Sequence, residues 1–223
     1  MTAPARFGRL ASMYRWLEYL SFGPYLDRCR NLRLPEMTSA RNALVYGDGD
    51  GRFLARLVSA APQMTITAVD ADSTMLRHAA RRLPPQAHVT LRQADALAYT
   101  PQGHYDLIVS HFFVDCFSDA ELISLLQRLP GAIDTSTVWV LSDFALPSGR
   151  VSSRVGRMVI SALYTAFGML TGLRTRSLPD HAAVMNAAGW LLEDQEHLLA
   201  GLLVSERWRY TGPAASGVQS QSD

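Results

Sequence analysis

The sequence predicts an α/β fold organised around a mostly parallel sheet. From residue 43 to residue 144, apolar segments of strand length alternate with segments that have the spacing of amphipathic helices. Strands joined through helices in this way form right-handed crossovers and therefore lie parallel. Two last apolar segments, 190–199 and 202–210, are separated only by Ala200 and Gly201, which predicts an antiparallel hairpin that closes the sheet.

Each predicted element has its own local signal. Apolar and β-branched content predicts strands at 43–46, 64–70, 88–95, 105–113 and 136–144. Helical spacing predicts helices at 51–61, 73–83, 120–129 and 181–189, with an apolar helix near 151–170. Asp72 or Ser73 is expected to cap the second of these helices, and Ser118 or Asp119 the third, because short oxygen-bearing side chains accept from free backbone N–H groups at helix starts.

The chain reads as one main domain with two flanking segments. Residues 40–210 hold the alternating elements. Residues 1–39 show helical spacing and are interpreted as an N-terminal helical lid or extension. Residues 211–223 are small and polar, and we expect them to form a disordered tail.

Composition excludes several functions. The 223 residues are 48% hydrophobic with a formal net charge of +1, which is typical of a globular domain and does not favour nucleic-acid binding. The chain has no lysine, so it cannot carry a Gly-Lys-Ser/Thr phosphate loop, a Schiff-base lysine or a kinase-type catalytic lysine. The histidines and two cysteines lack the spacing of a metal site, so no metal is expected.

Location and membrane contact are read from two segments. The first twenty residues lack the apolar run of a secretory signal, so a cytoplasmic protein is expected. The apolar segment Met158–Leu170 belongs to an uncharged run that would span roughly 24 Å as a helix, short of the ~30 Å hydrocarbon core of a bilayer. Flanking arginines such as Arg157 and Arg174 leave a peripheral membrane contact open beside simple core packing.

A glycine cluster follows the first predicted strand. Gly47, Gly49 and Gly51 alternate with Asp48 and Asp50 and open a helix. Glycines at such a turn let the backbone approach a ligand closely. In an open parallel sheet, ligands bind at the carboxyl ends of the strands. Two carboxylates in the turn disfavour a pyrophosphate and favour a cationic ligand.

Two further carboxylates follow the next strands. Asp70 ends the second strand, where it can accept from ribose hydroxyls. Asp95 ends the third strand, where it can accept from an adenine amino group. The glycine turn and these two acids, at the ends of three successive strands, indicate an adenosyl ligand.

At this point the sequence resembles the class I S-adenosylmethionine-dependent methyltransferases. The resemblance covers about residues 40–210 and rests on ALVYGDGDGRFLARL, ITAVDADSTML, LRQADAL, YDLIVSHFF, VLSDF and GWLLEDQEHLLAGLLVSERW. It implies a Rossmann-like three-layer sandwich, with a mostly parallel seven-stranded sheet and an antiparallel last strand. It also implies S-adenosyl-L-methionine as the cofactor.

The resemblance assigns roles to the residues at the strand ends. Gly47, Gly49 and Gly51 would line the methionine and ribose part of the cofactor, and Asp70 with the adjacent Ala71 would lie at the ribose.

The residues after the third and fourth strands are assigned in the same way. Asp95 would hold the adenine amino group, with Ala96 and Leu97 against the ring. His111 would lie near the transferred methyl group.

One position departs from the family pattern. The acid that usually stands two residues before the first glycine is replaced by Val45. Our hypothesis is that Asp48, inside the turn, contacts the ammonium group of the cofactor instead.

Methyl transfer depends mainly on alignment and exclusion of water. A base is needed only when the nucleophile keeps its proton, and His111 is the candidate because a histidine pKa suits neutral pH; shaping of the pocket is the other interpretation. A small, hydrophobic or aromatic acceptor is expected, since aromatic segments could cover the site. The residues predicted to contact this acceptor are Tyr14, Phe22, Phe112 and Tyr164.

Other interpretations remain open at this stage. The aromatic segments could belong to the core or to a dimer contact. The chain could bind the cofactor without turnover, or it could be a nucleotide-dependent oxidoreductase of similar architecture. The glycine spacing and the terminal hairpin disfavour the oxidoreductase.

Overall fold

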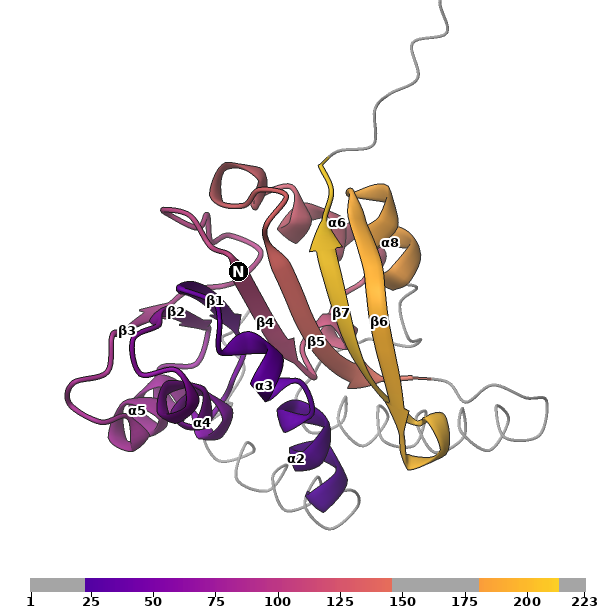
Figure 1. Cartoon of the computed structure of the whole chain (residues 1–223). Helices are drawn as coiled ribbons and strands as arrows, with labels where there is room; N and C mark the ends of the chain where they lie inside the picture. The colour runs from indigo at the N-terminus through magenta and orange to yellow at the C-terminus, as the bar shows by residue number, and fades with distance from the viewer. Residues whose placement is uncertain (1–22, 146–180, 213–223) are drawn as a thin grey trace, which may run out of the picture.

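A seven-stranded sheet forms the centre of the computed structural model, which describes residues 23–145 and 181–212. The strand order is β3-β2-β1-β4-β5-β7-β6 (Figure 1). The strands are β1 (Asn42–Tyr46), β2 (Thr65–Asp70), β3 (Val89–Gln93), β4 (Leu107–His111), β5 (Val138–Phe144), β6 (Trp190–Leu198) and β7 (Leu203–Tyr210). All paired strands are parallel except β7, which is antiparallel to both β5 and β6. The predicted fold class is therefore confirmed.

The helices predicted at 51–61, 73–83, 120–129 and 181–189 occur where their sequence signals lie. The described helices are α2 (Gly23–Asn31), α3 (Leu34–Met37), α4 (Arg52–Ala60), α5 (Ser73–Arg82), α6 (Asp119–Leu126) and α8 (His181–Ala187). Short 3₁₀ turns are η1 (Val114–Cys116), η2 (Pro130–Ala132) and η3 (Leu199–Gly201). Asp72 caps α5 by accepting from the Thr74 N–H, and Ser118 forms a capping box with Glu121 at α6.

Helices cover both faces of the sheet and make three layers. Along β5, Trp139 and Leu141 point into the apolar cluster under α6 and α8, and Val140 points into the opposite cluster. That second cluster holds the apolar face of α4, including Phe53. The alternation follows from the strand period of two residues. The carboxyl ends of the central strands therefore lie between two packed helical layers.

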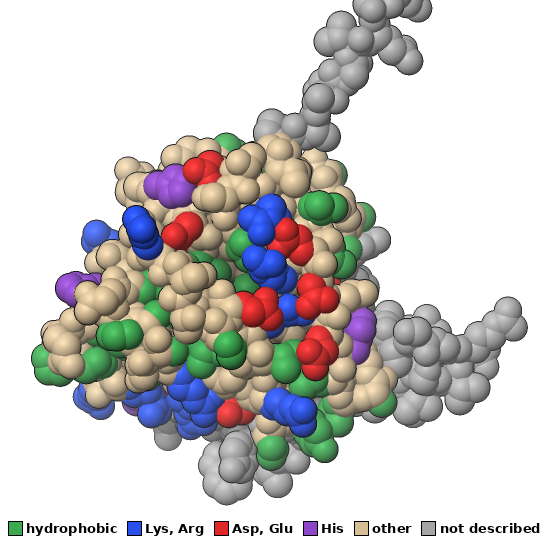
Figure 2. Space-filling view, viewed as in Figure 1, with side chains coloured by type: hydrophobic (Ala, Val, Ile, Leu, Met, Phe, Trp, Pro, Cys, Tyr) green, Lys and Arg blue, Asp and Glu red, His purple; other side chains and the backbone are tan. Residues whose placement is uncertain are grey.

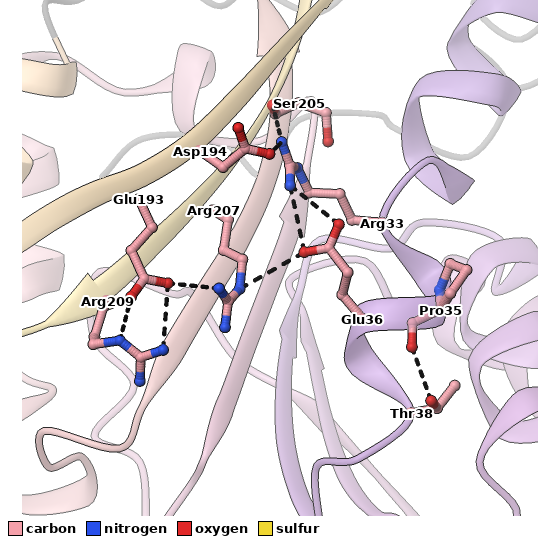
Figure 3. A network of polar contacts seen from close by, with 9 residues as sticks. All are labelled: Arg33, Pro35, Glu36, Thr38, Glu193, Asp194, Ser205, Arg207 and Arg209. Atoms are coloured by element: carbon pink, nitrogen blue, oxygen red, sulfur yellow. Dashed lines mark hydrogen bonds and ion pairs between the residues drawn. The ribbon is translucent and has the colours of Figure 1, made fainter.

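Charged side chains join the closing hairpin to Arg33, directly before α3, and to Glu36 within α3. Arg33 is 3% exposed and donates to Asp194 at 2.7 Å, to the Ser205 carbonyl at 3.3 Å and to Glu36 (Figure 3).

The network continues along β7. Arg207 bridges Glu36 and Glu193, and Glu193 also pairs with Arg209 (Figure 3). Basic and acidic side chains gather together over this hairpin in Figure 2.

Several predictions fall outside the described residues. These are the apolar helix near 151–170, the first 22 residues of the expected lid and most of the expected tail. The division at residue 39 stays a prediction, although residues 23–31 and 34–37 are helical, as expected for the N-terminal extension. Within 23–145 and 181–212, no helix has the length and apolarity needed to cross a membrane.

Candidate functional site

The glycine turn between β1 and α4 has one open side. Gly47, Gly49 and Gly51 have φ values of 63°, 68° and 81°, in the left-handed region that favours glycine. A Cβ on Gly47 would lie 2.3 Å from the Phe113 ring, and a Cβ on Gly51 would lie 2.4 Å from Ala79 Cα on α5. A Cβ on Gly49 would meet no atom within 4 Å. Gly47 and Gly51 therefore allow close packing, and Gly49 provides the surface that a ligand can approach.

Asp70 lies at the carboxyl end of β2 and joins the same turn. Its Oδ1 accepts from the Asp72 N–H at 2.8 Å. Burial raises the pKa of Asp70, and hydrogen bonds from the N–H groups of Asp72 and Gly49 counteract part of that rise. The structure thus brings Asp70 and Gly49 together, as the sequence predicts.

The two acids inside the turn differ in their surroundings. Asp48 Oδ2 accepts from the Leu54 N–H at 3.1 Å, in the first turn of α4. Burial raises the pKa of Asp48 to about 7, against the lowering effects of Leu54 and Arg30. Asp50 pairs with Arg52 and with Arg82, so its charge is neutralised within the protein. Of these two acids, Asp48 is therefore the one available to contact a cationic ligand.

The residues after β3 form the next part of the site. Asp95 is exposed, and its Oδ1 accepts from the Leu97 N–H at 2.9 Å. Ala96 is buried in the cluster that contains Tyr46, and Leu97 packs against that cluster. Ala71 is exposed directly after β2. This arrangement offers an apolar floor with a carboxylate beside it.

His111 ends β4 and is 6% exposed. Its Nδ1 lies 3.0 Å from Ser142 Oγ, and its buried Nε2 has no hydrogen-bond partner. The ring packs edge-on against Phe53, with centroids 4.4 Å apart. Burial, together with the Arg30 charge, lowers the pKa of His111 to about 3. The expected neutral-range pKa is therefore wrong, because the ring is held away from water.

Two neighbouring phenylalanines take different places. Phe112 has a φ of 53°, which ends β4, and its ring lies beside Phe144 with the Arg30 guanidinium 5.0 Å above it. Phe113 instead stacks on Tyr46 and lies against Gly47. Phe113 is thus the ring at the glycine turn. Phe112 lies in a separate cluster with α2.

The other predicted acceptor contacts, Tyr14, Phe22 and Tyr164, lie outside the described residues.

Sequence reasoning missed a buried pair of carboxyl groups, Asp115 and Asp143. Asp115, in η1, is only 5% exposed, and its N–H donates to Asp143 Oδ2 at 3.1 Å. Burial, with the Asp115 charge and hydrogen bond, raises the pKa of Asp143 well above its usual range. The sequence carries one signal for this pair, because Asp143 stands within a strand whose residues are mostly buried.

The chain is similar to several methyltransferases. Residues 43–133 match a family model described as a methyltransferase domain. Mitomycin 7-O-methyltransferase MmcR is similar at a TM-score of 0.65 and 18% identity, covering 84% of this chain and 54% of that one. CalO1, a methyltransferase in calicheamicin biosynthesis with bound S-adenosylhomocysteine, is similar at a TM-score of 0.65 and 17% identity, and the match covers 92% of this chain and 57% of that one. N-methyltransferase NodS from Bradyrhizobium japonicum WM9, also in complex with S-adenosylhomocysteine, is similar at a TM-score of 0.62 and 16% identity, and the match covers 92% of this chain and 98% of that one.

These matches differ in extent. The chain spans a little over half of the length of MmcR and CalO1 and nearly all of NodS. The search of curated proteins gave no match. The matched domain contains β1 to β4 with the glycine turn, and the whole sheet has the topology expected of the family. Residues 43–133 are therefore similar to a methyltransferase domain, and the sheet as a whole has the fold of the methyltransferases named above.

Proposed function

We propose that this protein transfers the methyl group of S-adenosylmethionine to a small, hydrophobic or aromatic acceptor. The observation that carries the proposal is the open side of the turn at Gly49, next to Asp70 at the end of the neighbouring strand. A backbone free of side chains beside a carboxylate fits a nucleoside ribose. The lack of space for a Cβ at Gly47 and Gly51 keeps the turn close to the sheet.

The residues present fit an adenosyl cofactor. Asp70 would accept from the ribose hydroxyls, and Asp95 would accept from the adenine amino group above Ala96 and Leu97. Asp48 would face the positive end of the cofactor, since the ionised carboxylate attracts an ammonium or a sulfonium. When bound, the cofactor supplies a methyl group on a positively charged sulfur, which leaves as a neutral thioether.

The chain's own residues would then align the acceptor and exclude water. Phe113 and Tyr46 form an apolar wall beside the turn, which suits an apolar acceptor or the adenine itself. His111, with its lowered pKa, is a weak base and acts as a neutral hydrogen-bond acceptor. The related structures support a small-molecule acceptor, but MmcR is described as an O-methyltransferase and NodS as an N-methyltransferase.

The test is calorimetric titration of the purified protein with S-adenosylmethionine and, separately, with NADH. Binding of S-adenosylmethionine alone supports the proposal. Binding of NADH alone would favour the oxidoreductase. If S-adenosylmethionine binds but cell extract yields no demethylated cofactor, the protein is a binding module without turnover.

A matched pair of glycine variants locates the site. Gly49→Ala and Gly103→Ala both add a methyl group to open space at a positive φ, with similar backbone strain. Gly103 lies in the loop before β4, away from the carboxyl ends of the strands. We expect Gly49→Ala to weaken S-adenosylmethionine binding at least tenfold and Gly103→Ala to leave it unchanged. Equal affinities in the two variants would rule out the turn as the cofactor site.

A further inference from the structure

The hydrogen bonds around Ser142 bear on which nitrogen of His111 carries the proton. Ser142, on β5, is fully buried. Its Oγ lies 3.0 Å from His111 Nδ1, 3.2 Å from the Cys29 carbonyl oxygen and 3.4 Å from Ser205 Oγ. A hydroxyl donates one proton and accepts through two lone pairs. These three contacts therefore restrict where the protons can be.

The carbonyl oxygen of Cys29 can only accept a hydrogen bond, so the Ser142 hydroxyl donates its proton to that oxygen. Without it, two oxygen lone pairs would face each other at 3.2 Å. His111 Nδ1 then donates to one lone pair of Ser142. In the 3.4 Å contact between the two serine hydroxyls, Ser205 takes the donor role, because the single Ser142 proton is already used. This arrangement satisfies all three contacts and places the ring proton on Nδ1.

Nε2 of His111 is left with a buried lone pair. A buried polar atom without a partner is unfavourable, so Nε2 is suited to accept a hydrogen bond from a bound molecule. Its position suits the proposed site, because Tyr46 pairs with Ser110 and the next residues along β1 and β4 are Gly47 and His111. The His111 ring also packs on Phe53, in the first turn of α4.

We propose that Ser142 is a positioning residue that holds His111 in the Nδ1–H tautomer, so that Nε2 accepts a hydrogen bond from the methyl acceptor. This inference rests on the proposed function and specifies its substrate class. The acceptor carries a hydroxyl or N–H group that is still protonated when it binds. A carboxylate would place an oxygen lone pair against the Nε2 lone pair and would be rejected.

The first test reads the tautomer directly by nitrogen-15 NMR of histidine-labelled protein without cofactor. The His111 signals are identified by their loss in His111→Asn. We expect a proton on Nδ1 and a lone pair on Nε2 in the wild type. A proton on Nε2 would overturn the proposal.

Two paired serines provide the variant and its control. Ser142 and Ser205 are register partners on β5 and β7 and are equally buried, but only Ser142 contacts His111. Ser142→Ala is expected to lose the pure Nδ1–H signature, and Ser205→Ala is expected to keep it. A tautomer unchanged in Ser142→Ala would show that Ser142 does not position the ring.

The second test addresses the substrate class with 1-naphthol and its methyl ether, added to protein saturated with S-adenosylhomocysteine. Only the naphthol can donate a hydrogen bond. We expect it, and not the ether, to shift the Nε2 resonance of His111. Equal shifts, or no shift with either compound, would overturn the assignment of Nε2 to the acceptor. Failure of the proposed function would appear separately, as an absence of cofactor binding in the calorimetric titration.

Discussion

The carboxyl group of Asp48 lies in the proposed cofactor site, and its charge depends on the pH. With a pKa of about 7, this group is only partly ionised at neutral pH in the free protein. A cationic ligand binds the ionised form better, so its affinity should fall as the pH drops below 7, by up to about tenfold per pH unit. Calorimetric titration of S-adenosylmethionine between pH 5.5 and 8.5 measures this dependence.

Asp48→Asn isolates that charge, since the amide oxygen can still accept from the Leu54 N–H. The variant should bind S-adenosylmethionine at least tenfold more weakly at pH 8, with little dependence on pH. Wild-type affinity in Asp48→Asn would refute the idea that Asp48 compensates for Val45.

Single residues of the site were only partly predictable from the sequence. The positions of Gly49 and Asp70 follow from local order, because a parallel sheet brings the ends of neighbouring strands together. The choice between Phe112 and Phe113 depends on one backbone angle, the φ of 53° at Phe112, which turns Phe113 toward Gly47. The contact of Ser142 with His111 joins two strands and is set by register alone.

At the scale of elements, the charged network connects the segment that carries α2 and α3 to the closing hairpin. Arg33 is buried, and it donates to two carboxylates and to the buried Ser205 carbonyl. Arg33→Gln should lower the free energy of unfolding by about 1–3 kcal/mol, because the carbonyl loses its donor while the exposed carboxylates can be hydrated. Urea unfolding followed by circular dichroism measures the change.

Arg56 offers the matched control. It pairs with Asp27 at the surface, where both side chains are nearly half exposed. Exposed ion pairs contribute about 0–1 kcal/mol, so Arg56→Gln should change stability little. An equal loss in the two variants would contradict the special role of the buried arginine.

The elements themselves were well predicted because their signals are local. The strand and helix bounds differ from expectation by one or two residues at most positions, as at β2 and α5. The differences come from tertiary contacts. The irregular register of β6 near Asp194, within the charged network, has no local sequence signal.

For the whole molecule, the buried pair of Asp115 and Asp143 sets a limit on the stable pH range. The folded state holds a proton on Asp143 where the unfolded chain is already ionised, because the pKa is raised on folding. Such a group stabilises the fold fully below the unfolded pKa, and this contribution is lost as the pH rises through the folded one. The free energy of unfolding should therefore fall as the pH rises from about 4, the ordinary pKa of an aspartic acid, toward the raised pKa of folded Asp143.

Asp143→Asn should flatten this fall. The amide can still accept from the Asp115 N–H and needs no proton at high pH. We expect the difference in stability between variant and wild type to grow with pH, by at most about 1.4 kcal/mol per pH unit. Parallel stability curves from about pH 4 upward to pH 10 would show that Asp143 does not hold the proton.

The position of β7 also has a consequence for biosynthesis. This strand pairs with β5 on one side and β6 on the other, yet among the strands of residues 23–145 and 181–212 it is the last to leave the ribosome. At about 5–20 residues per second, the interval between the ends of β5 and β7 is roughly 3–13 s. Throughout that interval the edge of β5 is unpaired and available to other strands, so a nascent chain needs protection there, and slow codons between residues 145 and 203 would lengthen its exposure.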